Sequence, residues 1–182
     1  MVPFITFEGI EGSGKTTQIA RAAEFLRRMG NEVVTTREPG GCPIADAIRE
    51  ILLNPANDAL VDRAELLLYA AARAQHVTEV IQPALEQGRI VLCDRYTDAT
   101  LAYQGYARGL DRALIEELNE LASAGCRPQL TLVLDMPPEV GLQRALQRNS
   151  DRDMADEGRF EQESLAFHQR VRDGYLALAK NE

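Results

Sequence analysis

The chain has 182 residues, 45% of them hydrophobic and 26% charged, with a net charge of −8. This composition is typical of one globular domain and excludes a disordered or collagen-like chain. The acidic charge makes nonspecific nucleic-acid binding unfavourable, and no apolar run approaches the ~18 residues that span a bilayer. Near the N-terminus, Glu8 interrupts the only apolar stretch. A cytoplasmic protein with neither a nucleic-acid nor a membrane partner is therefore expected.

Strand-like and helical patterns alternate along the chain. Strands are expected at Pro3–Phe7, Glu32–Thr35, Ile90–Cys93 and Leu130–Leu134, with the last two buried on both faces. Helices are expected at Thr16–Met29, Pro43–Leu53, Asp62–Gln87, Asp111–Ala124, Pro138–Arg148 and Arg159–Ala179, with Asp62 and Asp111 as N-caps. This alternation predicts an α/β fold with a parallel sheet and helices on both faces. Functional residues should then follow the carboxyl ends of the strands.

The strongest motif is Gly9–Thr16, which reads GIEGSGKT and lies between an expected strand and an expected helix. It matches the phosphate-binding P-loop pattern, in which backbone N–H groups and the helix N-terminus surround a phosphate. In that pattern Lys15 reaches the β- and γ-phosphates, and the Thr16 hydroxyl ligates Mg²⁺. The chain has twenty basic residues, and only Lys15 and Lys180 are lysines.

Two apolar strands end in aspartate, at Asp94 and at Asp135. An aspartate in this position serves Mg²⁺ or its water ligands in P-loop proteins. Asp94 is followed at once by Arg95, which places a cation beside the carboxylate, whereas Asp135 precedes a helix entry and is interpreted as structural.

Arginines supply two further candidate phosphate contacts. Arg37 follows the second strand, where it could bind a phosphate as a bidentate fork or form a solvated pair with Glu38. The segment Arg144–Arg159 carries four arginines against four acids. It is consistent with a solvated helix–loop–helix or with a lid that brings arginines onto a transferring phosphoryl group.

The three cysteines and two histidines are too scattered to predict a disulfide framework or a zinc site, and both histidines are interpreted as structural. They are Cys42, Cys93, Cys126, His76 and His168. A Ras-type GTPase would need N-K-x-D, which the absence of lysines between Lys15 and Lys180 excludes. The motifs therefore favour a kinase for a small phosphorylated acceptor, with a nucleotide-hydrolysing switch as the alternative.

Four motifs in order resemble bacterial thymidylate kinase, a P-loop nucleoside monophosphate kinase. They are Phe7–Thr17, Thr36–Gly41, Ala71–His76 and Asp94–Tyr96 followed by Ala102–Gly105. The resemblance implies a single domain over residues 1–182 with a three-layer P-loop NTPase fold and an arginine-containing lid at about 148–158. It implies transfer of the γ-phosphoryl group of ATP to dTMP with Mg²⁺, for dTTP synthesis, by a homodimer.

The resemblance also implies residue roles. ATP would be bound by Gly9, Ile10, Glu11, Gly12, Ser13, Gly14, Lys15, Thr16 and Thr17, with Mg²⁺ at Thr16 and Asp94. The acceptor would be bound by Glu11, Arg37, Tyr69, Arg73, Arg95, Thr100, Tyr103 and Gln104. Lys15, Asp94, Arg95, Arg148 and Arg152 would be catalytic. Tyr69 would stack on thymine, Arg73 and Gln104 would bind the base edge, and Tyr103 would exclude a ribose 2′-hydroxyl.

Three departures from the family pattern bear on these expectations. Gly12 stands where one subgroup has arginine, so the missing cation is assigned to Arg148 or Arg152. Cys42 stands where threonine is common, which removes a hydroxyl. The family's C-terminal strand and helix are absent from the pattern, so a four-stranded sheet with one open edge is expected, and an inactive fragment remains an alternative. A kinase for another nucleoside monophosphate is the nearest competing function.

Overall fold

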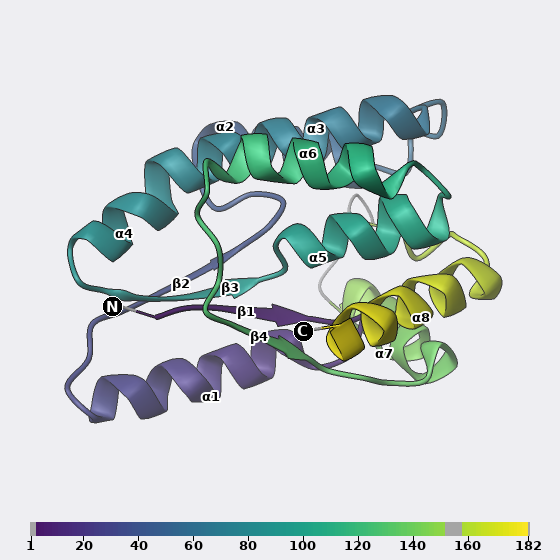
Figure 1. Cartoon of the computed structure of the whole chain (residues 1–182). Coiled ribbons are helices and arrows are strands. Elements are labelled where there is room, and N and C mark those ends of the chain that lie inside the picture. Colours follow the sequence, from purple (N-terminus) through teal and green to yellow (C-terminus); the bar gives the residue numbers. More distant parts are fainter. Residues whose placement is uncertain (1–2, 152–157, 182) are drawn as a thin grey trace.

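The computed structural model describes residues 3–151 and 158–181, in which four parallel strands lie between layers of helices (Figure 1). The strand order is β2-β3-β1-β4. The strands are β1 (Phe4–Glu8), β2 (Val33–Arg37), β3 (Ile90–Asp94) and β4 (Leu130–Val133). The predicted α/β fold with a parallel sheet is confirmed, and the described residues form the four strands that were expected.

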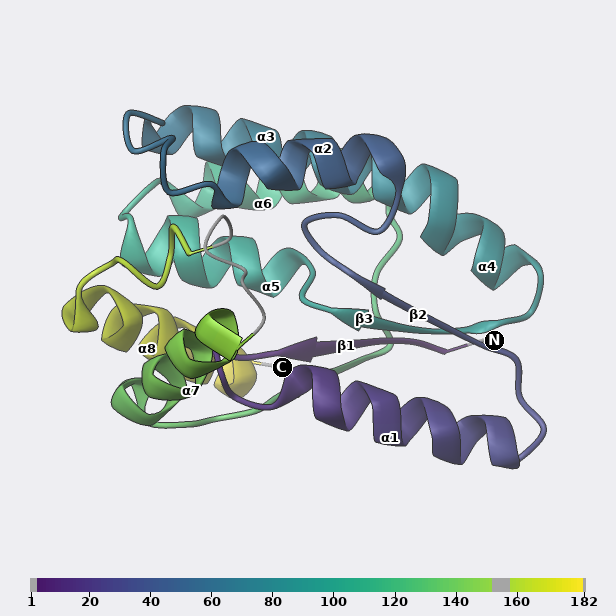
Figure 2. The same ribbon diagram turned by 180° about the vertical axis from the view of Figure 1, so that it is seen from behind.

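Helices cover both faces of the sheet and its carboxyl end. They are α1 (Lys15–Arg28), α2 (Pro43–Leu53), α3 (Asp62–His76), α4 (Gln82–Glu86), α5 (Thr97–Thr100), α6 (Arg112–Ser123), α7 (Pro138–Asp151) and α8 (Leu165–Asn181). Figure 1 shows α1 on one face and α3, α4 and α6 on the other. Seen from behind, α7 and α8 lie together where β1 and β4 end (Figure 2). This end of the sheet is therefore enclosed by helices.

The central strand β3 is buried on both faces, as predicted. Ile90 and Leu92 belong to the core beneath α1, whereas Val91 and Cys93 pack beside Val77 on the other face. Alternate side chains of a strand point to opposite faces, so a strand covered on both sides needs an unbroken apolar run. The sequence of β3 provides that run.

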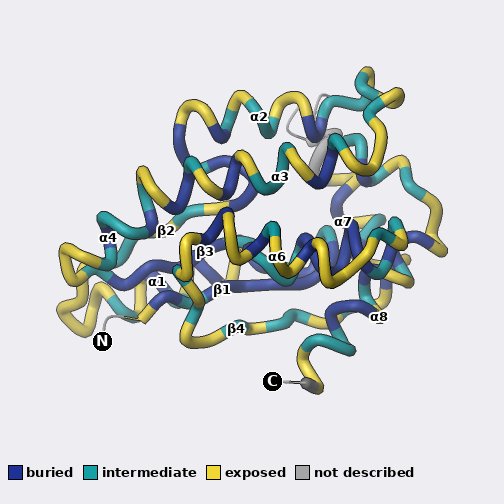
Figure 3. Tube along the Cα trace, turned by 45° about the horizontal axis from the view of Figure 1, so that its top comes forward, coloured by how far each residue is buried: buried dark blue, intermediate teal, exposed yellow. Residues whose placement is uncertain are grey.

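The prediction that β4 is a buried strand is wrong. Leu130 and Leu132 are 48% and 40% exposed. Within the described residues β4 pairs with β1 alone, so it is an edge strand (Figure 3). An apolar run shows that a strand suits burial, but the run does not show whether a neighbour covers it.

The helix boundaries confirm most expectations and correct two. The Asp111 carboxylate accepts a hydrogen bond from the Ala113 N–H at 3.0 Å and caps α6 as predicted. Asp62 is the first residue of α3 rather than its N-cap, which is Val61 and offers no side-chain cap. The last helix begins at Leu165, not at Arg159, because residues 159–163 form turns.

Two π-helical stretches interrupt regular helix geometry. The expected helix Asp62–Gln87 is helical throughout but includes η1 (Val77–Ile81) between α3 and α4. The second, η2 (Leu101–Ala107), continues α5 and was not predicted. Its buried aromatic and polar residues give no 3.6-residue apolar repeat, which explains the omission.

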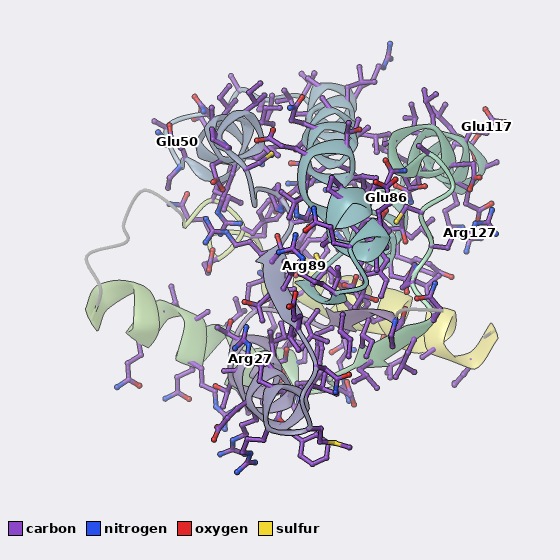
Figure 4. All side chains as sticks on the ribbon, turned by 90° about the vertical axis from the view of Figure 1, so that its left-hand side faces the viewer. Arg27, Glu50, Glu86, Arg89, Glu117 and Arg127 are labelled. Carbon is purple, nitrogen blue, oxygen red and sulfur yellow. The ribbon has the colours of Figure 1, made fainter. Side chains whose placement is uncertain are left out.

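Charged side chains are spread over several elements rather than along one basic face. Figure 4 labels examples on α1, α2, α4, α6 and the adjoining turns, namely Arg27, Glu50, Glu86, Arg89, Glu117 and Arg127. Among the described residues, no helix combines the length and apolarity needed to cross a membrane.

Candidate active site

A cleft of about 980 Å³ opens at the carboxyl ends of the strands. Its lining comes from the P-loop, the turns after β2 and β3, one face of α3, and η2. The predicted site residues that line it are Glu11, Gly12, Ser13, Gly14, Lys15, Thr16, Thr17, Arg37, Tyr69, Arg73, Asp94, Arg95, Thr100, Tyr103 and Gln104. Gly9 and Ile10 lie behind this surface, and Ile10 belongs to the core.

The P-loop packs Lys15 against its own backbone. The Lys15 ammonium donates to the carbonyl oxygens of Gly9 and Ile10, both at 2.9 Å. Burial, with the nearby positive charge of Arg95, lowers the pKa of Lys15 to about 8. The preceding residue, Gly14, has a φ of 95°, a left-handed conformation that glycine adopts without strain.

A second loop glycine permits a close backbone contact. Gly12 has a φ of 70°, and a Cβ atom there would lie closer than 3.0 Å to the carbonyl of Gly141 in α7. A Cβ on Gly141 would in turn collide with the Glu11 carbonyl. The P-loop and the first turn of α7 therefore touch backbone to backbone.

Asp94 and Thr16 meet at the end of β3. The Thr16 hydroxyl lies 3.3 Å from Asp94 Oδ2 and donates to it. Asp94 Oδ1 is buried and has no hydrogen-bond partner among the described residues. The next residue, Arg95, has a φ of 69°, which is strained for a non-glycine residue, and its N–H is held by the Phe7 carbonyl at 3.0 Å.

Arg95 joins the P-loop to η2. Its Nη2 atom donates to Glu11 Oε1 and to the Tyr103 hydroxyl oxygen, each at 2.9 Å. The Tyr103 hydroxyl donates to the same Glu11 oxygen at 2.5 Å. Burial alone would raise the pKa of Glu11, but Arg95, His168 and Tyr103 together hold it well below its usual range. The Glu11 carboxylate is thus kept ionised between the P-loop and η2.

Arg73 is buried in a network of its own. Its guanidinium donates to Glu38 at 2.8 Å, to Asn119 at 2.5 Å, to the Tyr96 carbonyl at 2.9 Å and to Thr100 at 3.0 Å. A guanidinium has five N–H donors, so these four bonds leave one. Arg73 is therefore paired with the buried acid Glu38, and one donor remains for a ligand.

Gln104 is held by a buried acid of α3. Its Nε2 atom donates to Glu65 Oε1 at 2.8 Å, which leaves the amide oxygen outside this contact. Glu65 is fully buried, and its Oε2 atom also accepts from Arg108 at 3.2 Å and from Arg159 at 2.6 Å. Glu65 therefore links α3, η2 and the turn that precedes α8.

Two predicted acceptor residues have weaker contacts. Tyr69 is partly buried, its ring lies 6.5 Å from that of Phe160, and burial raises its pKa. The Arg37 side chain is 55% exposed and is 3.4 Å from Asp46. Both side chains line the cleft.

The comparisons with known proteins agree with one another. The family model for thymidylate kinase matches residues 7–182. The chain is 68% identical to the thymidylate kinase of Syntrophotalea carbinolica, covering 98% of this chain and 83% of that one, and 64% identical to that of Geobacter sulfurreducens, covering 98% and 84%. The crystal structure of thymidylate kinase from Ehrlichia chaffeensis is 39% identical, with a TM-score of 0.78 over 99% of this chain and 82% of that one.

The chain belongs to the thymidylate kinase family. It is an ATP-dependent kinase that transfers the γ-phosphoryl group of ATP to dTMP, giving dTDP and ADP.

The arginine-rich segment of residues 144–159 is only partly within the described residues. Arg148 lies in α7, but its side chain is outside what the structure describes, as is the whole of Arg152. Arg144 lines the cleft, and Arg159 donates to Glu65 and to the Leu52 carbonyl at 3.0 Å. Arg159 thus ties the turn before α8 to α2 and α3.

Several site-forming residues escaped the sequence reasoning. Glu65 lies four residues before Tyr69 and eight before Arg73, so its position on the same helix face was a usable signal. Glu38 was within a quoted motif but was interpreted only as a partner for Arg37. Phe160 and His168 gave no signal, because their contacts join segments far apart in the sequence. Asp135 binds Arg172 at 2.6 Å outside the cleft, in keeping with a structural role.

Proposed function

We propose that ATP binds at the P-loop end of the cleft and dTMP at the end formed by α3 and η2. The observation that carries this proposal is the group formed by Glu11, Arg95 and Tyr103, which stands where the two ends meet. Phosphoryl transfer passes through a loose transition state, so catalysis depends on in-line positioning and on cations around the moving group. One continuous cleft with arginine at its centre meets both needs.

At the donor end, the backbone N–H groups of residues 12–17 bind the ATP phosphates. Lys15 stabilises negative charge on the β- and γ-phosphates in the transition state. The strained backbone of Arg95 directs its guanidinium between donor and acceptor, where it contacts the transferred group.

The residues at the end of β3 fit Mg²⁺. Thr16 offers a hydroxyl oxygen, and the buried Oδ1 of Asp94, which accepts no hydrogen bond from the described residues and lies 4.0 Å from Arg95 Nη1, offers a hard anionic acceptor for the ion or its water. Among the described residues no group of three His, Cys, Asp or Glu side chains could hold a metal alone, so phosphate oxygens and water would complete the coordination. When bound, Mg²⁺ would neutralise part of the negative charge of the ATP phosphates.

At the acceptor end, Arg37 and Arg95 bind the dTMP phosphate, and Glu11 faces the 3′-hydroxyl. Tyr69 stacks on the base, and Tyr103 occupies the space that a ribose 2′-hydroxyl would need. Arg73, Thr100 and Gln104 bind the base edge. Since Glu65 accepts from the Gln104 amide nitrogen, the amide oxygen is the atom left to accept from the base.

The lid arginines Arg148 and Arg152 supply the remaining cation. Replacing both with alanine should lower kcat and leave the KM for dTMP nearly unchanged, because the lid acts on the transferred phosphoryl group. Single variants identify which arginine acts. An unchanged kcat in both single variants and in the double variant would contradict this assignment.

We further propose a cytoplasmic homodimer formed through α3 and α6. These helices pack on each other and carry exposed apolar side chains, including Leu67, Leu114 and Leu121 at 52%, 47% and 78% exposure. Burial of such a patch favours association. Light scattering during gel filtration tests it: a monomer would contradict the proposal, and L67E should dissociate a true dimer.

The central experiment is ADP formation from Mg-ATP with dTMP, dUMP, UMP, AMP or no acceptor. Turnover with dTMP well above the others is expected. Equal turnover with another monophosphate would contradict the acceptor assignment, and acceptor-independent hydrolysis would indicate a switch. Binding of dTMP without turnover would mean that this chain lacks elements needed for transfer.

A further inference from the structure

Two buried polar atoms face each other behind the P-loop without a hydrogen bond. Glu11 Oε2 and His168 Nδ1 lie 3.4 Å apart, and their side chains are 12% and 1% exposed. Neither atom has another hydrogen-bond partner among the described residues. Buried polar atoms are nearly always satisfied, so this pair requires an explanation.

The other ring nitrogen defines the protonation state of His168. Its Nε2 atom lies 3.0 Å from the carbonyl oxygen of Phe160. A carbonyl oxygen only accepts, so Nε2 must carry hydrogen. In a neutral ring Nδ1 would then be a bare lone pair directed at a carboxylate oxygen, which is repulsive. A second proton on the ring, at Nδ1, turns the same contact into a charge-assisted hydrogen bond.

The carboxylate is the wrong place for that proton. Glu11 Oε1 already accepts from Arg95 and Tyr103. Arg95, with Tyr103 and Lys15, opposes the effect of burial and favours the ionised form of Glu11. The ionised form of Glu11 therefore leaves the proton on the imidazole.

We propose that His168 is a positioning residue, whose imidazolium anchors Glu11 Oε2 and thereby fixes the Glu11–Arg95–Tyr103 group for phosphoryl transfer. The inference rests on the proposed role of that group at the acceptor end. Under this proposal, catalysis depends on a proton carried by His168 of α8, a residue outside the motifs that carry the family resemblance.

Other charged groups near α8 have separate partners. Lys15 and Arg95 both act on Glu11, and the ring of Phe167 lies 5.5 Å from that of His168. The remaining contacts of α8 and its neighbours are Glu8 with Tyr175, Asp135 with Arg172, Arg170 with the Ala107 carbonyl, and Arg108 with Glu163. Glu11 is therefore the acid that faces the imidazole among the described contacts.

Two substitutions test the contributions of the two ring nitrogens separately. In H168N the amide nitrogen replaces Nδ1 and offers Glu11 a permanent donor, whereas in H168Q it replaces Nε2 and offers a donor to Phe160 only. We expect H168N to keep kcat/KM for dTMP near that of the unmodified chain and H168Q to lose about tenfold to a hundredfold, the effect of one charge-assisted hydrogen bond. A packing role alone would affect both variants alike.

The variant that keeps only the Phe160 contact gives the decisive activity readout. Full activity in H168Q would overturn the proposal.

Nitrogen-15 NMR of labelled histidine tests the protonation state without activity. The chain has two histidines, and comparison with H168N assigns the His168 signals. Two protonated ring nitrogens at neutral pH are expected, and a bare Nδ1 would overturn the inference. If the chain fails to phosphorylate dTMP, this spectrum still decides the protonation state, so the two failures are distinguishable. Thermal melting of each variant verifies folding.

Discussion

The two ends of the cleft are built in opposite ways. The donor end is nearly contiguous, since residues 9–17 supply backbone N–H groups, the lysine and the hydroxyl, and Asp94 adds one carboxylate. The acceptor end is assembled from α3, η2 and the turns after β2 and β3, and buried acids hold its side chains. A contiguous site depends on local backbone geometry, whereas an assembled site depends on long-range ion pairs.

The largest expected effect comes from breaking the donor end. Replacing Lys15 with methionine keeps most of the side-chain volume and removes the charge beside the phosphates. We expect kcat to fall by about 10²- to 10³-fold, the usual effect of losing one transition-state donor. Affinity for dTMP, measured by calorimetry, should change little. A large loss of dTMP affinity would show that the two ends are not separable.

Breaking the acceptor end should affect both stability and dTMP binding. E65Q removes the charge that faces Arg108 and Arg159, which are 14% and 10% exposed. Loss of one partner in a buried ion pair costs about 3 kcal/mol of unfolding free energy. We expect chemical denaturation to show that loss and the KM for dTMP to rise, with the KM for ATP unchanged.

The matched control for Glu65 is E163Q. Glu163 also binds Arg108, but its side chain is 28% exposed. Solvent reduces the value of such a pair, so E163Q should lose well under half as much stability. Equal losses in the two variants would mean that burial of Glu65 is not what makes it important.

Glu8 is fully buried at the end of β1, and its protonation makes the stability of the fold depend on pH. Burial, with the charge of Asp98, raises its pKa from 4.5 to about 8. The folded state therefore binds a proton that the unfolded state releases, so stability falls as pH rises from about 5 to 8. E8Q mimics the protonated acid, and between pH 6 and 8 it should lose roughly 2 kcal/mol less than the unmodified chain. The same dependence of unfolding free energy on pH in E8Q and in the unmodified chain would contradict this prediction.

The smallest effect is expected outside the cleft. Arg172 and Asp135 form a two-bonded pair at 2.6 and 2.8 Å, but their side chains are 27% and 42% exposed. R172A should lower the unfolding free energy only slightly, because solvent screens the pair, and should leave both KM values unchanged. A change in either KM would show that the active site includes the surface formed by Arg172 and Asp135.

Sequence reasoning succeeded most often where structure is local, although it missed two local features, the true cap of α3 and η2. The P-loop, β3 and the Asp111 cap follow from adjacent residues, and all three were predicted. The exposure of β4 depends on which strand lies beside it, and an apolar run such as Leu130–Val133 does not contain that information. Glu65 was missed because an acidic residue in a helix is usually exposed to solvent. Its arginine partners lie in distant segments of the sequence, so the sequence around Glu65 does not reveal them.

The contact between Gly12 and Gly141 constrains how this chain can change over evolutionary time. Neither position accepts a side chain while the other keeps its place, so a single substitution at either one disturbs both the phosphate loop and the start of α7. A cation introduced at position 12 would require α7 to take another course, and α7 leads into the arginines assigned to the lid. Moving the catalytic cation from lid to loop is therefore a coordinated change, which a lineage reaches through several substitutions rather than one.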